Sequence, residues 1–265
     1  MMVDNVLLSA SRTNVHETVA LAVERGIGVE VMAFAFPDIL DGDWRITLAE
    51  YQEILKPLEG TLTLHGPFMD MVSGSPDPRI NAVCVQRYSH AIRIAAELGA
   101  KQVVFHANFI GSLHNTFYRE GWHQRNIIFW KPMAEYAAEH GVTVLLENMW
   151  EFDPTILSDL LSAVDNPALR CCFDVGHAHL FSDKQYTFDY WLRTLEPWLS
   201  EIHMNNNNGI IDEHHGFDWS RGVLDYQEIL PKIRAAHNNL DLVLEMDLVE
   251  DMRDSLYYFR IEELA

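Results

Sequence analysis

Cysteine is scarce in this chain of 265 residues, which contains only three. Two of them, Cys171 and Cys172, are neighbours and would point to opposite faces of one strand. An odd number in this arrangement argues against a disulfide framework, and the lack of paired Cys-x-x-Cys motifs excludes a zinc site built from thiolates. We therefore expect buried, inert thiols, so that any metal ion is bound by histidines and carboxylates.

Basic side chains are also few. Lys and Arg number 19 against 39 Asp and Glu, which gives a formal net charge of −20 at pH 7, and they form no cluster along the sequence. Such a charge repels long polyanions, because binding to a phosphate backbone depends on concentrated Lys and Arg. We therefore do not expect duplex DNA as a partner.

Long apolar runs are absent. No run approaches the roughly 20 residues that a membrane helix needs, and the N-terminal MMVDNVLLSA has no basic region before its apolar stretch. These absences predict a soluble, cytoplasmic protein without membrane contact. Nothing in the sequence indicates an oligomeric state.

A linker rich in Pro, Gly or Ser is missing too, so we expect one domain over residues 1–265. Short runs of Val, Ile, Leu and Phe alternate with segments of helical period, which is typical of parallel βα units. The expected strands are NVLLSA near Val6, GVEVMAFAF near Val31, TLTLH, KQVVFH, VTVLLE, LRCCFD, LSEIHM and LDLVLEMD. The expected helices span residues 15–25, 47–58, 77–98, 122–139, 154–164, 188–198, 226–236 and about 251–264.

Eight strands that alternate with helices predict a fold of the α/β class, namely a single (β/α)₈ TIM barrel. The alternative is an open, doubly wound sheet. We disfavour it because no glycine-rich phosphate loop follows the first strand.

Histidine is plentiful, with 13 copies, and several of them close the expected strands. Six consecutive runs end in His, Asp or Glu, namely His65, His106, Glu147, Asp174, His203 and Glu245. One such residue alone could be a hydrogen-bonded histidine or a helix-capping carboxylate. Six of them in register predict a shared site, because the C-terminal strand ends of a TIM barrel carry its chemistry. Clustered carboxylates and imidazoles need a cation to offset their repulsion, and they suit Zn²⁺, Mn²⁺, Fe²⁺ or Co²⁺.

Two further segments supply candidate ligands. In FDVGHAH, His177 lies three residues after the end of its strand and is able to reach a second ion from the same loop. In DEHH, Asp212 and His214 are two residues apart and able to bind that ion together with His177. An acidic surface loop is the alternative for DEHH. His179 is open between a role at the site and a place in a solvated loop.

With these residues in place, the stretch from HGPF to LVLEMD resembles the TIM-barrel superfamily that contains endonuclease IV and the xylose isomerase-like sugar isomerases and epimerases. The endonuclease IV pattern has three zinc ions on nine ligands, and all nine positions have a compatible residue here. The resemblance implies one ion on His65, His106 and the bridging Glu147, a second on Glu147, Asp174, His203 and Glu245, and a third on His177, Asp212 and His214. Zinc is the expected metal, with Mn or Co as alternatives and one to three ions per chain.

The isomerase and epimerase branch uses only the second of these ions, and its two glutamates move protons beside the sugar carbonyl. The other five ligands are not strictly required there. We therefore expect, by a narrow margin, an enzyme that hydrolyses a small phosphoester or phosphodiester, with sugar or sugar phosphate isomerisation or epimerisation as the alternative. Glu147 is the expected bridge between ions and Glu245 the base of the isomerase alternative. A barrel that only binds a small ligand or partner is a third possibility.

Departures from the endonuclease pattern favour a small-molecule substrate over DNA. Phe68 in HGPF stands where that pattern has a tyrosine, and basic loops for a phosphate backbone are missing. After His214, the segment HHGFDWSRG replaces the Leu-Pro-Leu-Gly-Glu-Gly type of turn of many isomerase-like members, which leaves His215 as an alternative ligand. The candidates for an apolar wall, or else for packing within their own loops, are Phe68, Trp150, Phe217 and Trp219.

Overall fold

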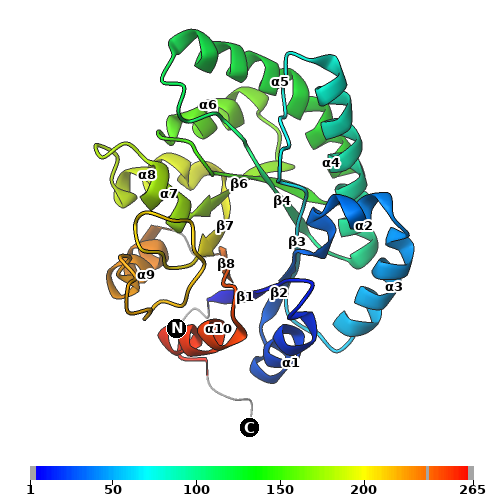
Figure 1. Cartoon of the computed structure of the whole chain (residues 1–265), viewed down its shortest axis with the longest axis vertical. Coiled ribbons are helices and arrows are strands. Elements are labelled where there is room, and N and C mark those ends of the chain that lie inside the picture. Colours follow the sequence, from blue (N-terminus) through cyan, green and yellow to red (C-terminus); the bar gives the residue numbers. More distant parts are fainter. Residues whose placement is uncertain (1–3, 237–238, 262–265) are drawn as a thin grey trace.

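A closed ring of parallel strands forms the centre of the computed structural model, which describes residues 4–236 and 239–261 (Figure 1). The strands are short apolar runs because a barrel strand is buried on both faces, by the packed interior and by the outer helices. They are β1 (Asn5–Ala10), β2 (Gly28–Val31), β3 (Leu62–His65), β4 (Gln102–His106), β5 (Thr143–Glu147), β6 (Leu169–Asp174), β7 (Leu199–Met204) and β8 (Asp241–Leu244). Each strand pairs with the next and β8 pairs with β1, which confirms the predicted (β/α)₈ barrel.

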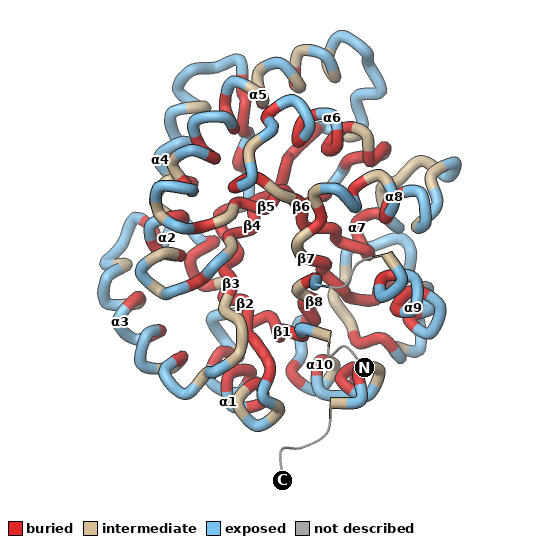
Figure 2. Tube along the Cα trace, turned by 180° about the vertical axis from the view of Figure 1, so that it is seen from behind, coloured by how far each residue is buried: buried red, intermediate tan, exposed pale blue. Residues whose placement is uncertain are grey.

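Helices surround the ring and turn their buried faces toward it, while their outer faces are exposed (Figure 2). They are α1 (Val15–Arg25), α2 (Pro37–Asp41), α3 (Trp44–Leu55), α4 (Pro78–Leu98), α5 (Thr116–Glu139), α6 (Thr155–Val164), α7 (Val175–Phe181), α8 (Phe188–Leu195), α9 (Tyr226–Ala236) and α10 (Val249–Ser255). Short 3₁₀ helices are η1 (Ala33–Ala35), η2 (Glu196–Trp198) and η3 (Leu256–Phe259).

Aromatic side chains fix several helices against the strands. Tyr88 of α4 stacks on Trp130 of α5 with ring centroids 5.4 Å apart, and it lies 4.2 Å from Phe105 of β4. On another side of the barrel, Phe173 of β6 stacks on Trp191 of α8 at 5.8 Å. Such contacts hold the strands firmly, and the side chains at the strand ends are held with them.

The structure differs from the predicted elements in several places. The second expected strand is shorter, because β2 ends at Val31 and the apolar run beyond it forms η1, in which Phe34 is fully buried. A buried apolar run does not distinguish strand from helix by its period. Helices α2 and α7 were not predicted, α3 is shifted toward the N-terminus, and α5 begins at Thr116. The expected last helix is divided into α10 and η3, and residues 262–264 lie outside the described part.

Other expectations about the whole chain have mixed outcomes. Cys84, Cys171 and Cys172 are buried free thiols, as expected. Within the described ranges, no helix is both long and apolar enough to cross a membrane. One domain over residues 1–265 stays a prediction.

The start of α4 provides a test of the fold. Asp77 is the N-cap of this helix, and its side chain accepts a hydrogen bond from the backbone N–H of Arg79 at 2.8 Å. We expect Asp77→Ala to lower the free energy of unfolding by about 1 kcal/mol, because one N–H at the helix start loses its acceptor. Denaturant unfolding measures the change, and Asp77→Asn, which keeps an acceptor, is the control. Equal stability of wild type and Asp77→Ala would contradict this role.

Candidate metal centre

The strand ends place a ring of polar side chains at one mouth of the barrel. Strands β3 to β6 end with His65, His106, Glu147 and Asp174 in that order. His203 lies one residue before the end of β7, and Glu245 directly follows β8. All six are buried, with at most 7% of any residue exposed. The structure therefore brings together the six strand-end residues that the sequence singled out.

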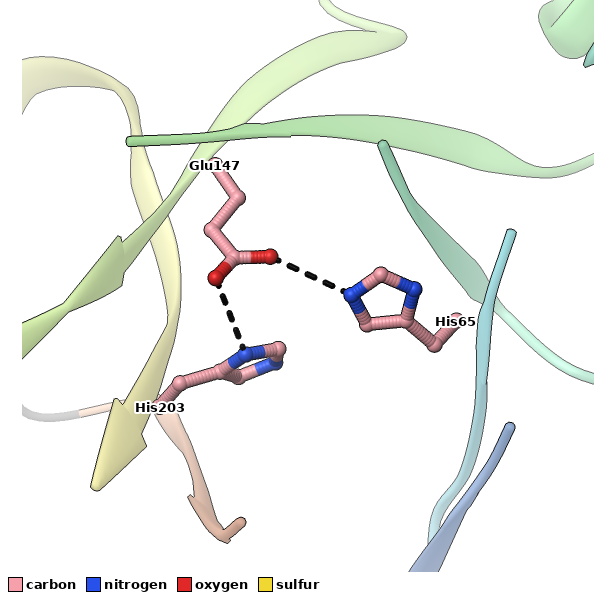
Figure 3. A group of neighbouring side chains, drawn as sticks. All are labelled: His65, Glu147 and His203. Carbon is pink, nitrogen blue, oxygen red and sulfur yellow. Dashed lines mark hydrogen bonds and ion pairs between the residues drawn. The ribbon is translucent and has the colours of Figure 1, made fainter. Parts of the chain in front are cut away.

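Glu147 lies at the centre of this ring. Its Oε2 is 3.2 Å from Nε2 of His65 and 3.2 Å from Nε2 of His106. Its Oε1 is 3.2 Å from Nδ1 of His177 and 3.6 Å from Nδ1 of His203. Figure 3 shows the carboxylate between the rings of His65 and His203. One buried carboxylate thus contacts four imidazoles.

A four-residue group within the ring has the geometry of a cation site. Glu147, Asp174, His203 and Glu245 each offer a ligand atom, and these atoms all lie within 4.8 Å of one another. Three atoms here, Oε1 of Glu147, Nδ1 of His203 and Oε2 of Glu245, are buried without a hydrogen-bond partner. Such atoms are costly in a protein interior unless something pairs with them.

The tautomer of His203 sharpens this fit. Its Nε2 contacts Oε1 of Glu201 at 3.2 Å, and its Nδ1 contacts Oε2 of Glu245 at 3.2 Å. Burial acts to lower the pKa of His203, but the acidic groups around it, Cys172 and Glu245 first, raise that pKa well above its usual range. A divalent cation bound by Glu147 and Glu245 would take the place of the Nδ1 proton, and the remaining proton would lie on Nε2, beside Glu201. The donor set, three carboxylates and one imidazole, suits Zn²⁺ or Mn²⁺.

Asp174 is held in place by three neighbours. Its Oδ1 accepts the backbone N–H of His177, which makes Asp174 the N-cap of α7. Its Oδ2 accepts from Nδ2 of Asn205 at 3.1 Å, and the Asn148 side chain bonds the Asp174 backbone N–H and C=O at 2.9 Å each. The segment FDVGHAH is therefore no loop, since its helix begins directly after β6 and His177 lies in the first turn.

A second group lies beside the first. Ligand atoms of His177, Asp212 and His214 lie within 4.8 Å of one another. Nε2 of His177 is 3.4 Å from Oδ2 of Asp212, and Nε2 of His214 is 3.4 Å from Oδ1 of the same carboxylate. Asp212 and His214 come from the long connection between β7 and α9, drawn in yellow and orange in Figure 1. All nine predicted ligand positions thus meet at one mouth of the barrel.

The charges of the ring shift the pKa values of its members. Burial acts to raise the pKa of Glu147, but the histidines around it, His106 first, lower that pKa well below the usual range. Burial acts to lower the pKa of His214, while Glu245 and Asp212 raise it to about 9. Burial raises the pKa of Asp174 to about 6. A cation that binds here would therefore displace protons from the imidazoles.

A cavity of about 590 Å³ opens onto these groups, and His65, His106, Glu245, Asp212 and His214 are part of its wall. Phe68 and Trp150 also line it, as predicted. The volume lies within the range of small-molecule sites in proteins.

Other expected wall residues lie elsewhere. Phe217 is buried and stacks on Tyr226 with ring centroids 3.7 Å apart, and Trp219 stacks on His215 at 3.9 Å. The ring of His215 thus belongs to a loop contact, which leaves His214 as the member of the second group. His179 is exposed on α7 and is not part of the cavity wall.

Several residues of the site were not found from the sequence. Glu151 is buried, its Oε1 accepts from the backbone N–H of Phe109 at 3.0 Å, and its Oε2 accepts from that of Met149 at 2.6 Å. It thereby joins the loops after β4 and β5, and burial raises its pKa to about 7. Two wall residues, Asp70 and Asn108, have φ of 55°, which is unusual for residues other than glycine and common at functional sites. In the sequence, the only possible sign of this role was that Glu151 is a carboxylate in a loop.

The fold and site define a (β/α)₈ protein with a ring of carboxylates and imidazoles at its mouth. A family model described as xylose isomerase-like TIM barrel matches residues 19–261, and the chain belongs to this family. The resemblance noted from the sequence is confirmed.

Individual proteins are similar to most of the chain. The uncharacterised protein MJ1311 of Methanocaldococcus jannaschii is 27% identical over 188 residues, which cover 69% of this chain and 63% of that protein. This chain thus matches less than two thirds of that relative's length. The TTHB071 protein from Thermus thermophilus, in a structure obtained by soaking with ZnCl2, is 27% identical with a TM-score of 0.80, over 97% of this chain and 96% of that one. A D-tagatose 3-epimerase-like protein has the same fold at 21% identity and a TM-score of 0.78, over 96% and 95%.

The number of zinc ions that the protein retains tests whether these side chains bind metal. We expect the purified protein, saturated with Zn²⁺ and desalted, to retain at least about one ion per chain. His203→Ala should retain fewer, because the four-residue group loses its imidazole. Elemental analysis gives the ratio, and His215→Ala, whose ring stacks on Trp219, is the matched control. Equal zinc content in wild type and His203→Ala would contradict a site at this group.

Proposed function

We propose that the protein is an enzyme, a divalent-metal-dependent isomerase or epimerase of a small sugar. The observation that carries the proposal is the group of Glu147, Asp174, His203 and Glu245, which lies beside a cavity of about 590 Å³ and has three ligand atoms without a hydrogen-bond partner. A cation bound by this group would polarise the carbonyl and hydroxyl oxygens of the sugar.

The two glutamates have different access to the substrate. Glu245 lines the cavity and is 5% exposed, whereas Glu147 is fully buried and does not line it. Glu245 is therefore the better placed base for the carbon beside the carbonyl. Burial acts to raise the pKa of Glu245, but His203 and His214 lower it to about 2. It is thus ionised at neutral pH and able to accept a proton. Glu147 contacts four histidines and would hold the cation rather than act on the substrate.

The charge of the cavity wall favours a neutral substrate. Among the described residues that line it, none is Lys or Arg, while Asp70, Asp212, Glu245 and Asp247 are acidic. A phosphorylated sugar would enter without a basic side chain to bind its phosphate. Hydroxyl and amide groups of Ser9, Ser11 and Asn108 are suited to sugar hydroxyls, and Phe68 and Trp150 to the apolar face of a ring.

The family model, described as xylose isomerase-like TIM barrel, supports this choice of reaction. The similarity to a D-tagatose 3-epimerase-like protein covers nearly the whole chain, although at 21% identity it bears on the fold alone. The TTHB071 protein, 27% identical to this chain, was soaked with ZnCl2, which makes zinc the first metal to test here. The narrow preference for phosphoester hydrolysis that the ligand pattern suggested finds no support in these relatives, and we place it second.

Proton transfer gives the direct test of this function. With Mn²⁺ or Co²⁺ and a panel of neutral ketoses in D₂O, we expect deuterium at the carbon next to the carbonyl of one of them, detected by NMR. Glu245→Gln keeps an oxygen for the cation but cannot accept the proton, so exchange should fall about 10²- to 10⁴-fold. His215→Ala is the control. Exchange at the wild-type rate in Glu245→Gln would rule out the assigned base.

The second candidate function, hydrolysis of a small phosphoester, is favoured by one observation. His177, Asp212 and His214 form a further ligand group, and His177 lies 3.2 Å from Oε1 of Glu147, which could bridge the two groups. Several ions held so closely suit the displacement of a phosphoryl group. An epimerase that uses the four-residue group alone does not need them.

His214→Ala separates the two functions. If the chain is an epimerase with one essential ion, this variant should keep isotope exchange within about tenfold of wild type, because Glu245 and the four-residue group are intact. If it is a hydrolase, the variant should lose cleavage of small phosphodiesters by a factor of about 10² or more, since metal ligands rarely tolerate removal. Parallel assays with both substrate classes, on wild type and variant, decide between them.

A further inference from the structure

Two glutamates lie in the interior of the barrel, below the ring of candidate ligands. Glu30 comes from the middle of β2 and Glu201 from β7, and both are completely buried. The interior of a (β/α)₈ barrel is ordinarily filled with branched apolar side chains. Two carboxylates at this depth are costly for folding, so their presence calls for a function.

Both carboxylates meet the same atom, Nε2 of His203. Oε1 of Glu201 is 3.2 Å from it and Oε1 of Glu30 is 3.3 Å from it, although their strands lie on different sides of the ring. Thr63 on β3 fixes Glu30 by donating its hydroxyl to Oε2 at 3.2 Å. The contact of Glu201 with His203 is a hydrogen bond, whereas that of Glu30 is a close electrostatic contact, since Oε1 of Glu30 and Oε2 of Glu201 have no hydrogen-bond partner. The imidazole is thus held from below by oxygens from two strands.

We propose that Glu30 and Glu201 are positioning residues that orient His203 for metal binding. They keep the proton of the neutral ring on Nε2, so that Nδ1 points its lone pair toward Glu147 and Glu245. They also stop the ring from rotating about its Cβ–Cγ bond, because rotation would break both contacts. A carboxylate that accepts the N–H of a metal-binding histidine increases the basicity of the ring and orients it. The inference rests on the proposed metal centre.

The position of Glu201 follows from the strand. Glu201 and His203 are two residues apart on β7, so both side chains point into the barrel. The register between β6 and β7 shifts at Cys171 and Cys172, because β7 has one extra residue there, Ser200, and Glu201 becomes the partner of Cys172. The same strand therefore supplies the histidine and one of the groups that orient it.

A competing explanation is another ion below the ring. Ligand atoms of Cys172, Glu201 and His203 lie within 4.8 Å of one another. An ion there and one at the four-residue group would each bind one nitrogen of His203, so the imidazole would have to lose both its protons. Orientation by the two carboxylates leaves one proton on the imidazole, and we therefore prefer this explanation.

The experiment measures metal affinity and stability in the same variants. We use Glu201→Met and the double variant Glu30→Gln/Glu201→Gln of the whole chain. Asp241→Asn is the matched control, because this carboxylate also lies near the barrel interior but bonds Asn5 and Gln102 instead of His203. Zn²⁺ affinity is measured by competition with a chelator, bound zinc by elemental analysis, and the Tm of the metal-free protein by thermal unfolding.

We expect Zn²⁺ affinity to fall about 10- to 100-fold in both variants, with the same maximal zinc content and little change in Asp241→Asn. The Tm of metal-free Glu201→Met should equal or exceed that of wild type, because an apolar side chain replaces a buried carboxyl group whose Oε2 has no hydrogen-bond partner. A purely structural role would instead lower Tm and affinity together, and that result would overturn the proposal.

Three other outcomes also count against it. Wild-type affinity in both variants would show that the orientation of His203 does not depend on these carboxylates, while the metal centre itself would stand. A loss of one zinc equivalent in Glu201→Met would favour the ion below the ring. A wild-type protein that binds no zinc would remove the metal centre and this inference with it, so the two failures are distinguishable.

Discussion

The mutual repulsion of buried carboxylates is the constraint on which the rest of the structure depends. Glu147, Asp174, His203 and Glu245 are brought within 4.8 Å because parallel strands all end at the same mouth of the barrel. Three of their atoms have no hydrogen-bond partner. An arrangement of this kind is unfavourable for folding on its own, and it becomes favourable when a divalent cation occupies it.

The residues around this four-residue group differ in role according to where they lie. Below it, Glu30 and Glu201 hold the ring of His203, and beside it Asn148 and Asn205 fix Asp174. Above it, the cavity wall supplies hydroxyl, amide and aromatic groups with no Lys or Arg among the described lining residues. A chain with a net charge of −20 thus presents a polar, acidic pocket, which agrees with the neutral sugar that we propose as its substrate.

Much of the fold and of the ring could be predicted from the sequence, because short apolar runs ended in His, Asp or Glu at regular intervals. The boundaries of β2 and the start of α7 could not, since an apolar run has no period of its own and FDVGHAH looks like a loop until Asp174 is recognised as an N-cap. Glu30 and Glu201 were missed for another reason. Each is a single carboxylate within an apolar strand, and only closure of the barrel brings both to His203.

Anomalous diffraction from a crystal of the wild-type protein grown with Mn²⁺ tests the central claim most directly. We expect a manganese peak within bonding distance of Glu147, Asp174, Glu245 and Nδ1 of His203, with Nε2 of that imidazole still beside Glu30 and Glu201. The absence of a peak among these four residues, with their side chains in the positions described here, would contradict it.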